Sequence, residues 1–154
     1  MEERSLQDTF APHGRCFGCG PLNRKGLRIK SRPEGDEVIA DWTPQPHHIA
    51  FSGFVSGGII STLLDCHGNW TAVHALMKAG RLDTAPGTVT AELSIKFVRP
   101  TPMAPLRLRA RAVRVSEGRV NVAGEVESGG RPTATMTGTF VVVKEGHPAF
   151  HRWG

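Results

Sequence analysis

The chain has 154 residues, of which 39% are hydrophobic, which is enough for one folded domain with its own core but short for two. Residues 1–5 do not resemble a signal peptide, and no run of about 18 apolar residues exists, so we expect a cytoplasmic protein without a membrane span. The net charge of +5 suits either nucleic acid or an anionic small molecule. Because the chain has no Tyr and lacks a zinc-finger or helix-turn-helix pattern, the small molecule is favoured, and we expect no nucleic-acid partner.

Residues 1–26 are rich in Gly, Pro and polar residues, and they predict an irregular lead-in to a single domain that spans 1–154. Cys16 and Cys19 have the spacing of a metal-binding pair. A tetrahedral site needs more ligands, however, and without a second such pair it would need Cys66 or His67 as well. We therefore prefer a turn that packs two reduced thiols over a structural zinc site, and we assign no metal ligands.

The next segments predict a hairpin and a long helix. Residues 27–31 and 37–42 alternate between apolar and polar side chains, which is typical of strands, and the turn lies at 33–36. From residue 57 to about residue 79 the apolar side chains cover much of a helix circumference, so this helix is predicted to be largely buried. Gly80 is its expected end.

After the helix the pattern changes to a period of two. In residues 88–97, Leu93 and its apolar neighbours occupy one face of a strand, and Thr88 and Thr90 lie on the other. Three further strands are predicted over 106–115, 119–127 and 133–143, joined by tight turns. These elements predict an α+β fold, in which an antiparallel sheet of about five to six strands wraps around one long central helix.

The start of that helix combines two features of a catalytic site. Gly57 and Gly58 leave the first backbone N–H groups of the helix open to a ligand, and these groups suit a carbonyl that becomes an oxyanion. Asp65 follows two turns later among apolar residues and is our candidate for a base or nucleophile. The alternative is a buried helix whose Asp65 pairs with an Arg or a backbone group.

Several segments together resemble the hotdog-fold thioesterases of the phenylacetate-pathway (PaaI-like) type. They are CFGCG at 16–20 with Asn23, the pair Gly26-Leu27, the pair Gly57-Gly58 followed by Leu64-Asp65, and VTAELSIKFVRP at 89–100. The resemblance implies a helix wrapped by a sheet, a homodimer or a dimer of dimers, and hydrolysis of an acyl-coenzyme A thioester without metal or organic cofactor. It also implies that the Gly57 and Gly58 amides polarise the thioester carbonyl, that Asp65 is the catalytic carboxylate, and that Thr90 helps to place the attacking water.

Four residues are candidates for binding the substrate. Family members commonly have His directly before the glycine pair, where this chain has Ser56, so Ser56 and His48 are candidates for contacts near the thioester. Their alternative roles are a helix cap and an exposed loop histidine. Lys96 and Arg99, with Arg107 as a third basic candidate, are predicted to bind the phosphates of coenzyme A; the alternative is a solvated strand face.

Three other functions remain in view. A non-catalytic protein that binds or senses acyl thioesters is the main alternative on this fold. An enoyl-thioester hydratase is disfavoured because its expected Asp and His pair is matched only by Asp8 and His13 in the lead-in. A thiol nucleophile formed by Cys66 and His67 is also disfavoured, because consecutive helix residues point about 100° apart.

Overall fold

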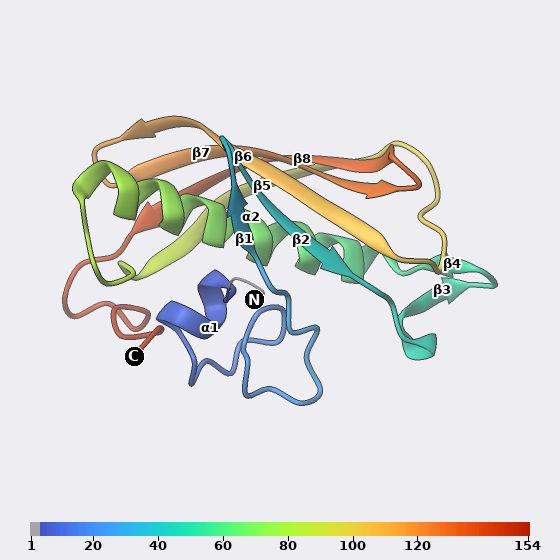
Figure 1. Ribbon diagram of the computed structural model, residues 1–154, viewed down its shortest axis with the longest axis horizontal. Coiled ribbons are helices and arrows are strands. Elements are labelled where there is room, and N and C mark those ends of the chain that lie inside the picture. The colour runs from blue at the N-terminus through green and yellow to red at the C-terminus, as the bar shows by residue number, and fades with distance from the viewer. Residues whose placement is uncertain (1–3) are drawn as a thin grey trace.

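A sheet of six antiparallel strands curves around one long helix (Figure 1). The computed structural model describes residues 4–154. The helices are α1 (Leu6–Phe10), the 3-10 turn η1 (Pro46–His48) and the long α2 (Gly57–Gly80). The strands are β1 (Arg32–Glu34), β2 (Glu37–Trp42), β3 (Ile49–Phe51), β4 (Phe54–Val55), β5 (Thr88–Phe97), β6 (Leu106–Ser116), β7 (Arg119–Ser128) and β8 (Arg131–Val142). The order in the sheet is β1-β2-β6-β7-β8-β5, and β3 and β4 form a separate hairpin. The predicted α+β fold is confirmed.

Helix α2 packs its middle turns against the sheet, as its apolar sequence predicts. Leu63, Leu64 and Trp70 are almost fully buried. At Gly68 a Cβ atom would come within 2.8 Å of Met136 and Phe140, so the helix lies tightly against the sheet at this residue. The N-terminal segment covers α2 from the side that the sheet leaves open (Figure 1), and Leu6, Ala11 and Ile29 belong to the same buried cluster as the helix. Within residues 4–154, no helix has the length and apolar character needed to cross a lipid bilayer.

The N-terminal part differs from the sequence prediction in two places. Helix α1 lies inside the segment expected to be irregular, because Ser5 caps its start by accepting a hydrogen bond from the backbone N–H of Asp8 at 3.0 Å. Residues 1–3 of that segment lie outside the described residues. The first strand is Arg32–Glu34 rather than 27–31, since Arg28 has a left-handed backbone with φ 52° that interrupts an extended chain.

The predicted end of the long helix is confirmed, and one short hairpin was not predicted. The left-handed residue that ends α2 is Arg81, with φ 50°, and Gly80 is the last helical residue. The short hairpin of β3 and β4 was not predicted, and it leads the chain directly into α2. The other predicted strands are confirmed to within two residues at each end.

A buried polar chain connects the N-terminal segment to α2 and to the sheet. The side-chain amide of Gln7 donates to Ser31 Oγ at 2.9 Å, and Ser31 Oγ lies 2.8 Å from Nδ1 of His67. Nε2 of His67 lies 2.8 Å from the carbonyl oxygen of Val38 and donates to it, because a carbonyl only accepts; the Ser31 hydroxyl therefore donates to Nδ1. Both imidazole nitrogens are satisfied in the neutral form, and burial lowers the pKa of His67 to about 4.

The lowered pKa of His67 predicts a loss of stability in mild acid. Between pH 6.5 and about 4 the unfolded chain takes up a proton on His67 and the folded chain does not. The free energy of unfolding should therefore fall as the pH falls through this window, by at most about 3 kcal/mol. Urea unfolding followed by tryptophan fluorescence measures it, and His13→Gln, which alters an exposed histidine, is the matched control and should keep the same slope.

Other groups add to this slope or oppose it: burial raises the pKa of Glu125, so that carboxyl binds its proton more readily in the folded chain and acts with the opposite sign. The Arg107 guanidinium holds the pKa of Asp41 below its usual 3.8, so that carboxylate loses its ion pair at lower pH. Burial lowers the pKa values of His48 and His74 too, which adds to the slope with the same sign. A free energy of unfolding that stays constant across the window would contradict this account of His67.

Candidate active site

The start of α2 is open to a ligand. Gly57 and Gly58 are exposed, and Ser56 occupies the N-cap position without a capping bond from its side chain. The first N–H groups of an α-helix have no intrahelical acceptor, so those of the two glycines face outward with the positive end of the helix dipole. The expected capping role of the Ser56 hydroxyl is therefore not observed. This hydroxyl stands beside the same N–H groups as a further donor.

His48 supports the turn that leads into this helix start. Its Nδ1 accepts a hydrogen bond from the backbone N–H of Gln45 at 2.9 Å, and its ring packs on Trp42 with 5.1 Å between ring centroids. Its carbonyl oxygen accepts from the N–H of Ser56 at 2.8 Å. With 6% of its surface exposed, His48 is not the exposed loop histidine of the alternative interpretation. Its role as a substrate contact stays a prediction.

Asp65 and Thr90 are in direct contact. The Thr90 hydroxyl donates a hydrogen bond of 2.6 Å to one carboxylate oxygen of Asp65, which joins the third turn of α2 to strand β5. Asp65 is half-buried, and Thr90 is exposed. The contact thus fixes one carboxylate oxygen and lies open to solvent, and it joins two predicted site residues that are distant in the sequence.

A bulge in β5 makes this contact possible. The pairing between β5 and β8 skips Ala91, so that Thr90 lies opposite Phe140 and Glu92 lies opposite Thr139. Phe140 is fully buried on the face of the sheet that covers α2, so Thr90 shares that inner face. Beyond the bulge the alternation of inward and outward side chains is shifted by one residue, so Leu93 and Ile95 also point inward and pack against the core. The prediction that Thr88 and Thr90 lie on the face opposite Leu93 is therefore wrong.

Asn69 makes a second contact between α2 and β5, next to the contact of Asp65, and it was missed in the sequence. It lies one helical turn after Asp65 and is buried, and its Oδ1 accepts a 2.6 Å hydrogen bond from the Thr88 hydroxyl. The signal was present as two polar side chains four residues apart on the helix and two threonines two residues apart on the strand. It was not recognised because the alternation in β5 places both threonines on the outer face when no bulge is assumed.

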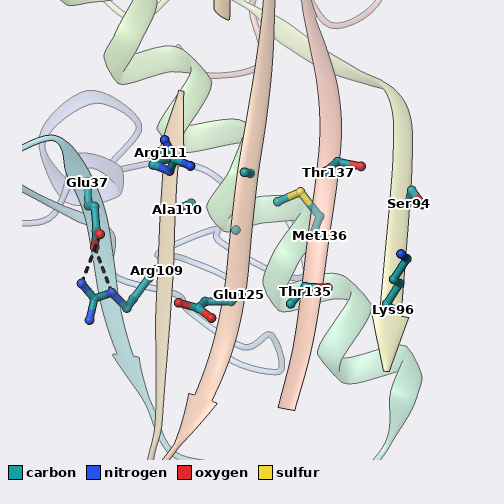
Figure 2. Close-up of a pocket in the computed structure, with 12 residues that line it drawn as sticks. Glu37, Ser94, Lys96, Arg109, Ala110, Arg111, Glu125, Thr135, Met136 and Thr137 are labelled. Carbon is teal, nitrogen blue, oxygen red and sulfur yellow. Dashed lines mark hydrogen bonds and ion pairs between the residues drawn. The ribbon is translucent and has the colours of Figure 1, made fainter. Parts of the chain in front are cut away.

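The basic residues predicted to bind phosphate lie in three different places. Lys96 is on the outer face of the sheet, where it lines a cavity of about 370 Å³ beside Thr135, with α2 behind the sheet (Figure 2). Arg107 is paired with the carboxylate of Asp41, with the closest contact at 2.9 Å. Arg99 follows β5 on the chain, and its Nη1 is buried with no acceptor among residues 4–154. One protomer does not bring Lys96 to the side of Asp65.

The thiols lie together but do not form a nucleophilic pair with His67. Hydrogen bonds with Cys16 and Cys19, together with burial, raise the pKa of the Cys66 thiol well above its usual value. Both nitrogens of His67 are already engaged by Ser31 and Val38. The sequence-based rejection of a Cys66 and His67 nucleophile thus has a structural reason. The sulfur atoms of Cys16, Cys19 and Cys66 all lie within 4.8 Å of one another, a spacing at which they are able to share a metal ion.

Comparisons with known proteins identify the relatives of this chain. The family model of the thioesterase superfamily matches residues 52–135, which include the glycine pair, Asp65 and Thr90. No curated protein matches the chain.

Solved structures show the same fold. A thioesterase superfamily protein from Shewanella loihica is 33% identical over 75% of this chain and 91% of its own, with a TM-score of 0.66. A phenylacetic acid degradation-related protein from Ralstonia eutropha is 26% identical over 75% of this chain and 86% of its own, with a TM-score of 0.63. A Bacillus halodurans protein, crystallised with coenzyme A, is 30% identical over 77% of this chain and 76% of its own, with a TM-score of 0.62.

The two threonine contacts predict a large and a small loss of stability for the same substitution. Thr88→Val leaves the buried Asn69 Oδ1 without its donor and should lower the free energy of unfolding by about 1–3 kcal/mol. Thr90→Val is the matched control because its contact with the half-buried Asp65 is open to solvent and water replaces the lost donor, so it should cost less than about 0.5 kcal/mol. Urea unfolding of the two variants measures the difference. Equal losses would contradict the assignment of a structural contact to Thr88 and an open one to Thr90.

Proposed function

We propose that this chain, which belongs to the thioesterase superfamily, hydrolyses an acyl-coenzyme A thioester to a free acid and coenzyme A. The observation that carries the proposal is the 2.6 Å contact between Thr90 and Asp65 on a helix whose glycine start is open. A carboxylate held by a hydroxyl and a set of free N–H groups are the two parts that thioester hydrolysis needs. The relative crystallised with coenzyme A supports the class of substrate.

The reaction follows from the chemistry of these groups. Asp65 takes a proton from a water molecule, whose oxygen attacks the thioester carbon, and Thr90 orients the carboxylate and that water. The carbonyl electrons move to the oxygen, which the N–H groups of Gly57 and Gly58 and the Ser56 hydroxyl stabilise. When the tetrahedral intermediate collapses, the carbon–sulfur bond breaks, and the proton on Asp65 passes to the departing sulfur. These steps use protein groups and water alone. Direct attack by Asp65 would instead give an anhydride intermediate that water then hydrolyses.

The N–H groups at the start of α2 and the carboxylate of Asp65 come together in a homodimer. Eight residues separate Gly57 from Asp65, which corresponds to roughly 12 Å along a helix, too far for one thioester carbon to contact both. Two antiparallel helices related by a two-fold axis place the start of one beside the middle of the other. Apolar side chains around the helix start support such an interface, since Phe51 is 59% exposed and Phe97 is 57% exposed beside Gly57. A dimer of dimers keeps the same shared site.

The phosphates of coenzyme A are assigned to Arg99 and, from the outer face, to Lys96. Arg99 is the stronger candidate of the two, because a buried guanidinium nitrogen that has no acceptor within the described part of the chain favours an anionic ligand. Lys96 reaches a ligand only if the coenzyme or a second protomer extends over the outer face of the sheet. Arg107 is less suited because its guanidinium already pairs with Asp41.

Replacing the carboxylate tests the assignment. Asp65→Asn keeps the shape of the side chain and removes its charge, so kcat should fall at least about a hundredfold with little change in the unfolding temperature. Release of free thiol from a panel of acyl-coenzyme A esters measures turnover. Asp36→Asn removes one exposed carboxylate from the turn between β1 and β2 and should leave kcat unchanged.

Two outcomes would contradict the proposal. Turnover of folded Asp65→Asn within a few-fold of the unsubstituted protein removes Asp65 from the mechanism. Binding of acyl-coenzyme A without thiol release from any ester in the panel identifies the protein as a thioester sensor or carrier instead.

A further inference from the structure

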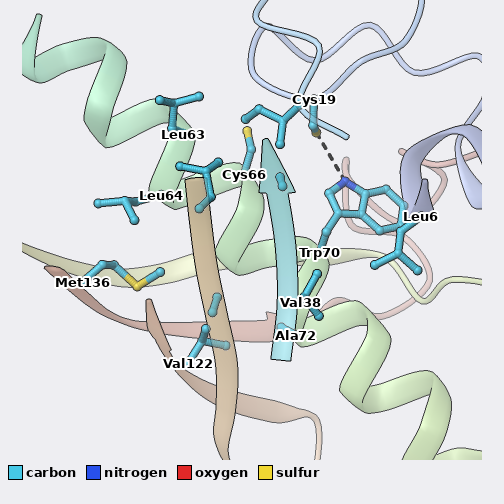
Figure 3. Close-up of a cluster of buried hydrophobic side chains, with 14 of the residues drawn as sticks. Leu6, Cys19, Val38, Leu63, Leu64, Cys66, Trp70, Ala72, Val122 and Met136 are labelled. Carbon is cyan, nitrogen blue, oxygen red and sulfur yellow. Dashed lines mark hydrogen bonds between the residues drawn. The ribbon is translucent and has the colours of Figure 1, made fainter. Parts of the chain in front are cut away.

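The three cysteines of the chain meet where the N-terminal loop crosses α2. Cys16 and Cys19 come from that loop, and Cys66 comes from the buried middle of the helix. Their sulfur atoms lie within 4.8 Å of one another, and those of Cys16 and Cys66 are 3.6 Å apart. Figure 3 shows Cys19 and Cys66 at this junction, with the Trp70 indole directed at Cys19. The proposed hydrolysis uses none of these thiols.

The spacing of the sulfur atoms fits a tetrahedral metal ion. Zn²⁺ binds thiolates at about 2.3 Å, and tetrahedral angles then put neighbouring sulfur atoms about 3.8 Å apart. The 3.6 Å between Cys16 and Cys66 is close to this value, and all three cysteines are free thiols. Thiolate ligands of this kind select zinc over magnesium or calcium, which prefer oxygen.

The loop is shaped so that its thiols reach the helix. A Cβ atom at Gly18 would overlap Cys66 Sγ, and one at Gly20 would overlap the backbone nitrogen of Cys16. Glycine at both positions therefore lets the loop turn tightly against α2, and the turn is closed by a 2.8 Å hydrogen bond from the Gly20 N–H to the Cys16 carbonyl oxygen. The Trp70 indole N–H donates to Cys19 Sγ at 3.4 Å, a contact that orients the sulfur and stabilises negative charge on it.

A fourth coordination position is available beside the thiols. Cys16 and Cys19 line a cavity of about 180 Å³, which has room for a water molecule or a small anion. Arg15 and Arg152 line the same cavity, and their positive charge favours the anion that three thiolates form with one divalent cation. His67 does not supply the fourth ligand because both of its nitrogens are engaged.

We propose that Cys16, Cys19 and Cys66 bind one Zn²⁺ ion as three thiolates, with water or a small anion as the fourth ligand. Each thiol loses one proton to the solvent as its sulfur bonds the metal. The ion joins the N-terminal loop to α2 at the residue that follows Asp65, and so it fixes the part of the helix that carries the candidate base. The sequence assigned no metal ligands because no second Cys-x-x-Cys pair follows the first, and the structure supplies the missing thiol from Cys66 on the helix.

Metal binding tests the proposal without reference to turnover. Reduced protein without an affinity tag is titrated with Co²⁺ as a spectroscopic probe and then with Zn²⁺. We expect saturation at one equivalent, a thiolate-to-cobalt charge-transfer band in the near ultraviolet, intense visible bands typical of tetrahedral Co²⁺, and loss of all bands when Zn²⁺ displaces the probe. Cys66→Ser should lose the charge-transfer intensity that its sulfur contributes and bind at least about tenfold more weakly.

Two controls separate a metal site from a packed turn. Thr62→Ala alters a side chain that lies against Gly18 but leaves all three thiols in place, so it should bind cobalt as the unsubstituted protein does. Because Cys66→Ser need not fold, the native protein is also treated with a thiol reagent: zinc should protect all three thiols, and a chelator should expose them. Absence of a charge-transfer band, an unchanged spectrum in folded Cys66→Ser, or loss of two thiols to a disulfide without metal would overturn the proposal.

Discussion

Helix α2 is buried along most of its length, yet its middle carries Asp65, Cys66, His67 and Asn69. A buried polar group without a partner is costly, so each of these side chains requires a partner from a surrounding element. Strand β5 supplies Thr90 and Thr88 to Asp65 and Asn69. The N-terminal segment supplies Ser31 to His67 and two cysteines to Cys66. The bulge at Ala91 places the threonines of β5 next to their helix partners, and glycine at residue 18 lets the cysteine loop approach Cys66.

The same constraint separates the stabilising contacts from the contact that we propose to be functional. His67 and Asn69 are buried, and both ring nitrogens of His67 and the Oδ1 of Asn69 have partners inside the protein, which suits residues that hold elements together. Asp65 is half-buried, and its hydroxyl partner reaches solvent, so its carboxylate is held in place without being sealed off. A carboxylate that is oriented and still accessible to water is what general base catalysis requires. The helix start adds fixed N–H donors, so the proposed chemistry depends mainly on where the backbone places these groups.

Periodicity in the sequence was enough to predict α2, the three-stranded meander and the α+β class, because each depends on a local pattern of burial. Asp65, Thr90 and the glycine pair were predicted as a set from the helix start and the family resemblance, and the structure places Thr90 against Asp65. The bulge was not predictable, because residues 88–97 alternate regularly and one skipped residue leaves no mark in that pattern. The left-handed Arg28 and the meeting of Cys16 with Cys66 depend on contacts between distant segments, which a single sequence does not reveal.

The central claim is that each active site combines the helix start of one protomer with Asp65 of its partner, and complementation tests it most directly. Gly57→Pro removes one N–H, and the proline fits, since Ser56 is extended and a Cβ at residue 57 meets only the Phe97 ring at 3.6 Å. Gly57→Pro and Asp65→Asn should each be nearly inactive alone. When co-expression mixes the subunits at random, half the dimers are mixed with one intact site each, so about a quarter of the original activity should return. Mixed dimers, verified by mass spectrometry, that are no more active than either parent would contradict the shared site.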